Sequence, residues 1–133
     1  MPKMADLVLI DTCVWVPFFS RKASLHKTAV GELLDEDRAV LIGPILTEIL
    51  LGFKRDEEAD WVASALEGAQ FFSLAWHDWR AAAGLGRALA SSGRSIPLSD
   101  LVPAAVAQHN HLLLYSIDPH FDLIPDLARF SPD

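Results

Sequence analysis

The sequence predicts an α/β domain with a mostly parallel central sheet of four or five strands flanked by helices. Short aliphatic runs alternate with helical segments along the whole chain, which is typical of parallel strands joined by crossover helices. The first run, Leu7-Val8-Leu9-Ile10, is apolar at every position, as expected for a strand that is buried on both faces. The chain has 133 residues, of which 51% are hydrophobic, and we expect residues 1–133 to form a single domain with its own core.

The first half of the chain is predicted to contain three helices and a second strand. The helices are expected at residues 12–19, 25–37 and 44–51, and the strand at 39–42. Pro17 lies near the beginning or the end of the first helix, and Pro44 opens the third helix, which Gly52 ends. The second helix is amphipathic, and residues near one of its faces are Leu25, Ala29, Leu33 and Leu34.

The second half continues the same alternation. Helices are expected at residues 53–66, 76–90 and 99–110, and strands at 70–74, 112–115 and, more briefly, 128–130. The charged run at 53–60 is interpreted as a solvent-exposed helix face. Ser99 is the expected N-cap of the last helix, and Pro103 falls near its first turn. The apolar positions of the helix at 76–90 include Trp76, Trp79, Ala83 and Leu89, and we expect its tryptophans in the core or an interface rather than stacked on bases.

Composition and charge restrict the classes of function. No apolar run approaches the ~20 residues that cross a bilayer, and the short mixed segment before the first strand does not resemble a signal peptide. Cys13 is the single cysteine, so we expect no internal disulfide and a cytoplasmic location. The formal net charge of −7 argues against nucleic-acid binding by bulk positive charge. It leaves open a nucleic-acid enzyme, because bound cations would reverse the charge of an acidic site.

Acidic residues stand next to apolar segments at several places. Asp11 ends the first strand, and Asp118 follows the strand at 112–115, with Asp122 four residues further on. Asp100 lies at the beginning of a helix, and Glu48 lies within an apolar one. Ligands of open α/β sheets bind beyond the carboxyl ends of the strands, where Asp11 is expected. An alternative is that Asp11 only caps the helix that follows it.

Glu48 is the most informative of these carboxylates. Its neighbours are Ile and Leu residues, and no Lys or Arg lies three or four positions away, so it should either point to solvent or meet a cation. Two carboxylates about 4 Å apart repel by roughly 4 kcal/mol at an effective dielectric constant of 20. A convergent cluster therefore implies shared protons or a divalent cation. Oxygen ligands without Cys or paired His favour Mg²⁺ or Mn²⁺ over Zn²⁺.

Other kinds of active site have little support in the sequence. His109 and His111 are two residues apart, which is not the i, i+4 zinc pattern, and the other histidines are scattered at His26, His77 and His120. The chain contains neither a glycine-rich phosphate loop nor a G-x-S-x-G elbow. Cys13 is interpreted as a small buried residue, because no nearby histidine would activate it as a nucleophile.

Four segments, in order, resemble the motifs of PIN-domain nucleases. LIDTCVW at 9–15 resembles the opening motif, and TEILLG at 47–52 resembles the second. IPLSDLVPAAVA at 96–107 and LLYSIDPHF at 113–121 resemble the third and fourth. The set spans nearly the whole chain. Its size and motifs are most similar to the VapC-type toxins of VapBC toxin–antitoxin pairs.

The resemblance implies a PIN-like parallel-sheet fold and a Mg²⁺- or Mn²⁺-dependent endoribonuclease. Positions that match the family's catalytic and metal-binding carboxylates are Asp11, Glu48, Asp100 and Asp118. Asp122 is a candidate helper with a weaker match. Thr12 and Ser116 match the family's hydroxyl positions, where they would orient carboxylates or water.

The resemblance also implies partners: an RNA substrate, a second copy in a homodimer, and a VapB-like antitoxin that covers the active-site groove. Because the chain is acidic, individual basic residues would have to contact phosphates, and the candidates are Arg21, Lys22, Lys54, Arg55, Arg87 and Arg94. The chain departs from the family pattern at Pro103, at Ser116 where Thr is commoner, and at Cys13 where a polar residue is usual.

Two alternative interpretations come from other classes of protein. One is a PIN-like module that binds RNA or protein without cleaving, which metal-dependent cleavage would distinguish. The other is a phosphatase or receiver of similar α/β shape. A haloacid-dehalogenase-type phosphatase needs a second Asp two residues after the first, where this chain has Cys13, and a receiver needs a late lysine, whereas none follows Lys54.

Overall fold

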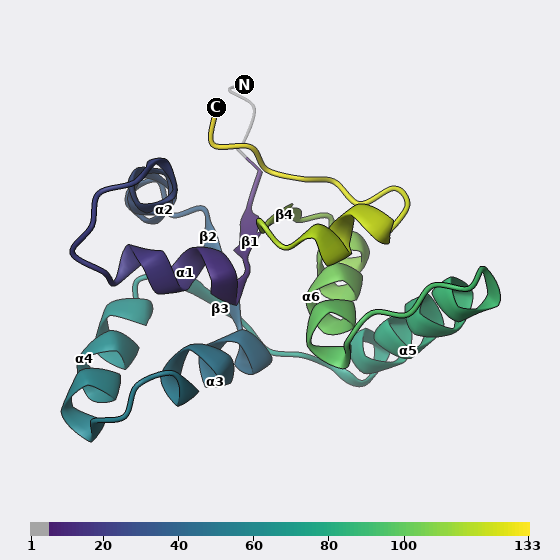
Figure 1. The fold of residues 1–133 in the computed structure, drawn as a ribbon, viewed down its shortest axis with the longest axis horizontal. Helices are drawn as coiled ribbons and strands as arrows, with labels where there is room; N and C mark the ends of the chain where they lie inside the picture. Colours follow the sequence, from purple (N-terminus) through teal and green to yellow (C-terminus); the bar gives the residue numbers. More distant parts are fainter. Residues whose placement is uncertain (1–5) are drawn as a thin grey trace.

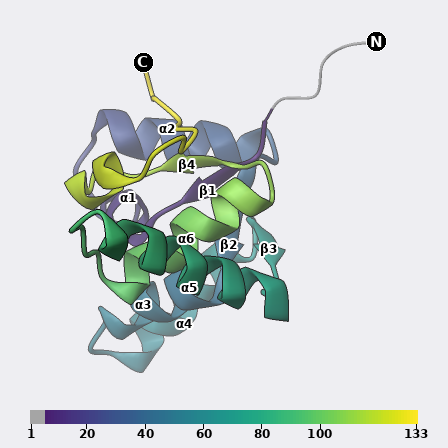
Figure 2. The ribbon, with the colours of Figure 1, turned by 90° about the vertical axis from the view of Figure 1, so that its right-hand side faces the viewer.

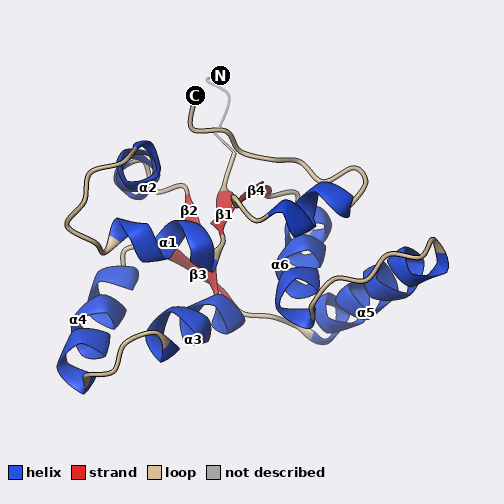
Figure 3. Ribbon diagram, in the orientation of Figure 1, coloured by secondary structure: helices blue, strands red, loops and turns tan. Residues whose placement is uncertain are grey.

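Four parallel strands form the central sheet of the computed structural model, which describes residues 6–133. The strands are β1 (Val8–Ile10), β2 (Ala39–Ile42), β3 (Gln70–Phe72) and β4 (Leu113–Tyr115), in the order β3-β2-β1-β4 (Figures 1 and 3). The predicted α/β class with a parallel sheet is confirmed. The fifth strand, expected at 128–130, is reduced to a single bridge between Leu114 and Arg129.

The strand β1 lies in the middle of the sheet and is fully enclosed. Val8 pairs with Ala39 of β2 on one side and with Leu113 of β4 on the other. Val8, Leu9 and Ile10 are all 0% exposed, which is what an uninterrupted aliphatic run predicts. The end of this strand is therefore held in a fixed position, and Asp11 follows it directly.

Helices cover both faces of the sheet. They are α1 (Thr12–Phe18), α2 (Leu25–Asp35), α3 (Gly43–Leu51), α4 (Asp56–Leu66), α5 (Trp76–Ser91) and α6 (Leu98–His109), and a 3₁₀ turn, η1 (Pro119–Leu123), follows β4. Figure 1 shows α1 to α4 on one side of the sheet and α5 and α6 on the other. Figure 2 shows α5 outermost, in front of α6. No helix within residues 6–133 combines the length and apolar character of a membrane span.

Several details of the helices differ from the sequence-based predictions. The last helix begins at Leu98 with Pro97 as its N-cap residue, and the Pro97 carbonyl accepts from the Asp100 and Leu101 amides, so Ser99 is not the cap. Leu25 is exposed, although Ala29 and Leu33 of the same helix are buried.

The tryptophans of α5 are exposed rather than buried. Trp76 and Trp79 are 78% and 48% exposed, so they do not belong to the core, and of the two expected places only an interface stays a prediction. The buried positions of this helix are instead Asp78, Ala82 and Leu89. The physical reason is that α5 packs mainly on α6 rather than on the sheet, so only a narrow stripe of α5 is covered.

Candidate active site at the carboxyl ends of the strands

The first part of the site is built where β1 and β4 end side by side. Ile10 is paired with Tyr115, and the Asp11 amide continues the ladder by donating to the Tyr115 carbonyl at 2.9 Å. Asp11 and Ser116 therefore emerge next to each other. The Ser116 hydroxyl donates to Asp11 Oδ2 at 2.9 Å and accepts from the Asp118 amide at 3.1 Å, so one hydroxyl links two of the acidic residues.

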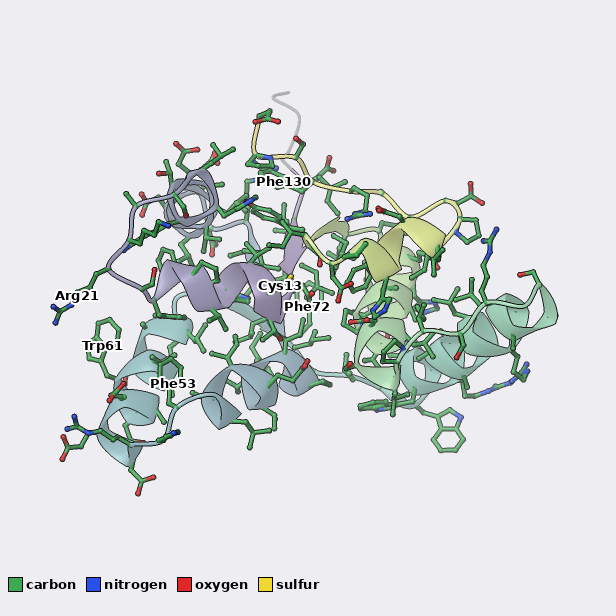
Figure 4. The ribbon with its side chains drawn as sticks, viewed as in Figure 1. Cys13, Arg21, Phe53, Trp61, Phe72 and Phe130 are labelled. Atoms are coloured by element: carbon green, nitrogen blue, oxygen red, sulfur yellow. The ribbon has the colours of Figure 1, made fainter. Side chains whose placement is uncertain are left out.

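Asp11 occupies the N-cap position of α1, but its side chain makes no capping hydrogen bond. The carboxylate is 5% exposed and instead accepts from Ser116 and from the Cys13 thiol, which lies 3.2 Å from Oδ2. Burial raises the pKa of the Cys13 thiol, which keeps it protonated as a donor. Figure 4 shows Cys13 at the centre of the molecule, where α1 meets β1. The capping alternative for Asp11 therefore does not describe its side chain.

Glu48 reaches the same place from α3. The buried face of this helix is formed by Ile45 and Ile49, which turns Glu48 outward to an exposed position, in agreement with the expectation that it meets solvent or a cation. The Thr12 hydroxyl lies 3.4 Å from Glu48 Oε1, at the long end of hydrogen-bonding range. Glu48 thus stands at the rim of the site, beside the first turn of α1.

Asp100 and Asp118 complete the acidic group from the other side of the sheet. Asp100 lies in the first turn of α6 and is 7% exposed, and Asp118 is the N-cap residue of η1. His120 connects them: its Nδ1 lies 2.7 Å from Asp100 Oδ2 and 3.3 Å from Asp118 Oδ1, and its amide donates to Asp118 Oδ1 at 2.9 Å. An ionised carboxylate only accepts hydrogen bonds, so Nδ1 is the donor when Asp100 and Asp118 are ionised.

These side chains line one open groove of about 570 Å³. The lining residues come from four segments: Asp11, Thr12, Cys13, Val16, Pro17, Glu48, Pro97, Ser99, Asp100, Asp118 and His120. All four carboxylates that the sequence singled out through its motifs are present. Residues more than 100 positions apart are therefore brought together by the parallel pairing of β1 with β4.

The carboxylates of the groove perturb one another. Loss of hydration raises the pKa of Glu48, and the negative charges of Asp11 and Asp100 add to this effect. Burial also raises the pKa of Asp100, helped by the charges of Asp118 and Asp11 and opposed by the hydrogen bond from His120. A cluster that resists full ionisation in this way is one that a cation would stabilise.

Comparison with known proteins agrees with this arrangement. The model of the PIN domain family matches residues 8–127. The chain belongs to the PIN-domain family. Ribonuclease VapC11 of Mycobacterium tuberculosis is 31% identical over 129 residues, which cover 94% of this chain and 96% of that protein.

Solved structures show the same PIN fold. DNA-bound VapBC from Salmonella typhimurium superposes with a TM-score of 0.83 at 14% identity and covers 97% of this chain and 100% of the other. VapBC2 from Rickettsia felis, bound to a DNA fragment from its promoter, gives a TM-score of 0.80 at 17% identity, over 93% and 97% of the two chains. At these identities the likeness is one of fold.

The donor set of the PIN groove suits a hard divalent cation. Its four carboxylates offer oxygen ligands, and one group of ligand atoms, from Asp100, Asp118 and His120, already lies within 4.8 Å of one another. PIN-domain nucleases use divalent metal ions in general, and the residues present here fit such an ion.

His120 is the groove residue that the sequence analysis missed. In the sequence it is one of several scattered histidines, yet in the structure it contacts two of the four carboxylates. Its position two residues after Asp118 is the signal in the sequence that points to it. In a 3₁₀ turn that begins with an Asp cap, the residue two positions later lies close to that cap.

Other predicted residues lie outside the groove. Asp122 is exposed and pairs with Arg129 at 3.0 Å. Arg129 also donates to the Ser116 carbonyl at 3.1 Å. Within residues 6–133, the groove lining includes none of the six basic residues proposed to bind phosphate. Arg55 pairs with Glu57 and Glu58 on α4, and Arg21 points outward, far from Cys13 (Figure 4).

Proposed function

We propose that this PIN-domain protein is the toxin of a VapBC-type toxin–antitoxin pair, a Mg²⁺- or Mn²⁺-dependent endoribonuclease that hydrolyses RNA phosphodiester bonds. One observation carries the proposal: carboxylates from four separate segments, Asp11, Glu48, Asp100 and Asp118, meet in one open groove. The 31% identity to a VapC ribonuclease over almost the full length supports the same reaction.

In this proposal Asp11, Asp100 and Asp118 would hold the cation, and Glu48 would hold it through a bound water. When bound, the ion lowers the pKa of a coordinated water and stabilises charge on the phosphoryl oxygens during hydrolysis. Mg²⁺ keeps several waters in most protein sites, so four carboxylates are more than enough for one ion.

Side chains of the protein orient the carboxylates and accept the proton that hydrolysis releases. Ser116 fixes Asp11 through its hydroxyl, and His120 holds Asp100 against Asp118. Glu48 is assigned as the proton acceptor, because it stands at the exposed rim and its pKa is raised by loss of hydration and by Asp11.

The partners follow from the same comparison. The solved relatives are VapBC assemblies, and we assign this chain a VapB-like antitoxin, with RNA as substrate and a second copy of the chain in a homodimer. The net charge of −7 means that RNA phosphates approach an acidic groove. A cation held by these carboxylates would offset the repulsion between the groove and the phosphates.

Cleavage of a mixed pool of structured RNAs tests the proposal, with Mg²⁺, with Mn²⁺ and with EDTA. Asp11→Asn removes one charge from the groove, and Asp122→Asn makes the same change outside it, so the second variant is the matched control. We expect metal-dependent cutting by the wild type and by Asp122→Asn, and a loss of about a hundredfold or more in Asp11→Asn. Undiminished cutting by Asp11→Asn would refute the site. Absence of cutting by antitoxin-free folded protein would favour the non-cleaving binding module.

A further inference from the structure

A second cluster of metal-binding side chains lies where α5 begins and α6 ends. His77 is the second residue of α5, Asp78 the third, and His109 the last residue of α6. Each of the three offers a ligand atom, and these atoms lie within 4.8 Å of one another. The two imidazole rings are stacked obliquely, with centroids 4.6 Å apart and planes inclined by 40°. None of the three residues lines the acidic groove.

We propose that His77, Asp78 and His109 form a transition-metal site that binds Zn²⁺ and joins α5 to α6. Two imidazoles and one carboxylate are a donor set that suits Zn²⁺ rather than Mg²⁺. Three protein ligands leave a coordination position for water, as in zinc sites that are open to solvent.

One of the ligand separations in the cluster is already close to that of a formed site. His77 Nε2 lies 3.6 Å from Asp78 Oδ2. Two ligands bound at about 2.0–2.1 Å around a tetrahedral ion are roughly 3.4 Å apart, so this pair needs almost no movement. Both histidines are exposed and can rotate to close the remaining separation.

Asp78 is held in place for this role. It is 4% exposed, its Oδ2 accepts from the Ala75 amide at 2.8 Å, and its Oδ1 accepts from the Asn110 side chain at 3.3 Å. Outer hydrogen bonds of this kind orient metal ligands.

The site would be separate from the candidate active site, although both use α6. Asp100 lies in the first turn of this helix and His109 at its end, so nine residues at 1.5 Å each put them about 14 Å apart along the axis. A Zn²⁺ ion at the second site would fasten the far end of the helix that carries Asp100 into the groove.

Zinc titration with a competing chromophoric chelator tests the proposal on four proteins: wild type, His109→Gln, Asp100→Asn and His111→Asn. Asp100→Asn disables the acidic groove, and His111→Asn removes a neighbouring exposed histidine as the matched control. We expect one tightly bound Zn²⁺ in every protein except His109→Gln, in which the affinity falls about tenfold or more. Zn²⁺ should also raise the melting temperature of the wild type and not that of His109→Gln.

The outcomes separate the two sites without reference to RNA cleavage. Tight Zn²⁺ that is lost in Asp100→Asn but kept in His109→Gln would place the ion in the acidic groove and overturn the proposal. Tight Zn²⁺ in all four proteins, or in none, would overturn it as well. Because His109 is exposed, its substitution should leave the circular dichroism spectrum unchanged, which excludes loss of fold as the cause.

Discussion

At the scale of single residues, Asp100 is a carboxyl group held in an electrostatically unfavourable place. It is almost fully buried in the first turn of α6, and its pKa is raised by burial and by the charges of Asp118 and Asp11. A carboxyl group whose pKa is higher in the folded than in the unfolded protein destabilises the fold when it ionises. That penalty is complete above the raised pKa and is relieved as the pH falls through it toward the ordinary carboxyl value.

A substitution at Asp100 should therefore stabilise the metal-free protein. We expect Asp100→Asn to melt a few degrees above the wild type in EDTA at neutral pH, with the difference shrinking as the pH is lowered through the acidic range. Adding Mg²⁺ should raise the melting temperature of the wild type and leave the variant unchanged. Differential scanning calorimetry across this pH range measures both effects. A variant that is less stable than the wild type in EDTA would contradict the repulsion inferred here.

At the scale of elements, β1 is the part on which the site depends. Its three residues are completely buried, and it is hydrogen-bonded on both sides, to β2 and β4. The strand β4 delivers Ser116 and Asp118 to the place where β1 delivers Asp11. Packing around β1 therefore sets the distances within the groove. The exposed parts of α3 and α5 contribute less to these distances.

Truncating one β1 side chain should be costly and truncating an exposed leucine should not. Leu9→Ala is expected to lower the free energy of unfolding by about 2–5 kcal/mol, through lost burial and a cavity. Leu51→Ala removes the same atoms from a side chain that is 78% exposed, and a change within about 0.5 kcal/mol is expected. Urea denaturation of the two variants gives the comparison. Equal losses in both would mean that β1 is not the centre of the core.

At the scale of the whole molecule, the sequence predicts the buried strands from their composition and the acidic residues from the order of their motifs. The β1 and β2 runs were recognisable because parallel strands buried on both faces lack polar residues. The motif order identified Asp11, Glu48, Asp100 and Asp118 as one set, and the fold places them in one groove.

Features that depend on packing between distant segments were not predictable from the sequence. His120 looked isolated because its contacts with Asp100 require η1 to lie over α6. His77 and His109 are 32 positions apart and meet only because α5 packs on α6. The exposure of Trp76 likewise depends on how much of α5 its neighbours cover, which hydrophobicity alone does not reveal.

Locating a bound cation is the most direct test of whether the four carboxylates of the groove form a metal site. Crystals of the wild type and of Asp11→Asn can be grown with Mn²⁺, and its anomalous scattering identifies the ion without ambiguity. We predict an anomalous peak within the groove of the wild type, between the carboxylates of Asp11 and Asp100, and no such peak in Asp11→Asn. Wild-type crystals that contain Mn²⁺ elsewhere but none in the groove would contradict the claim that these carboxylates form a metal-dependent nuclease site.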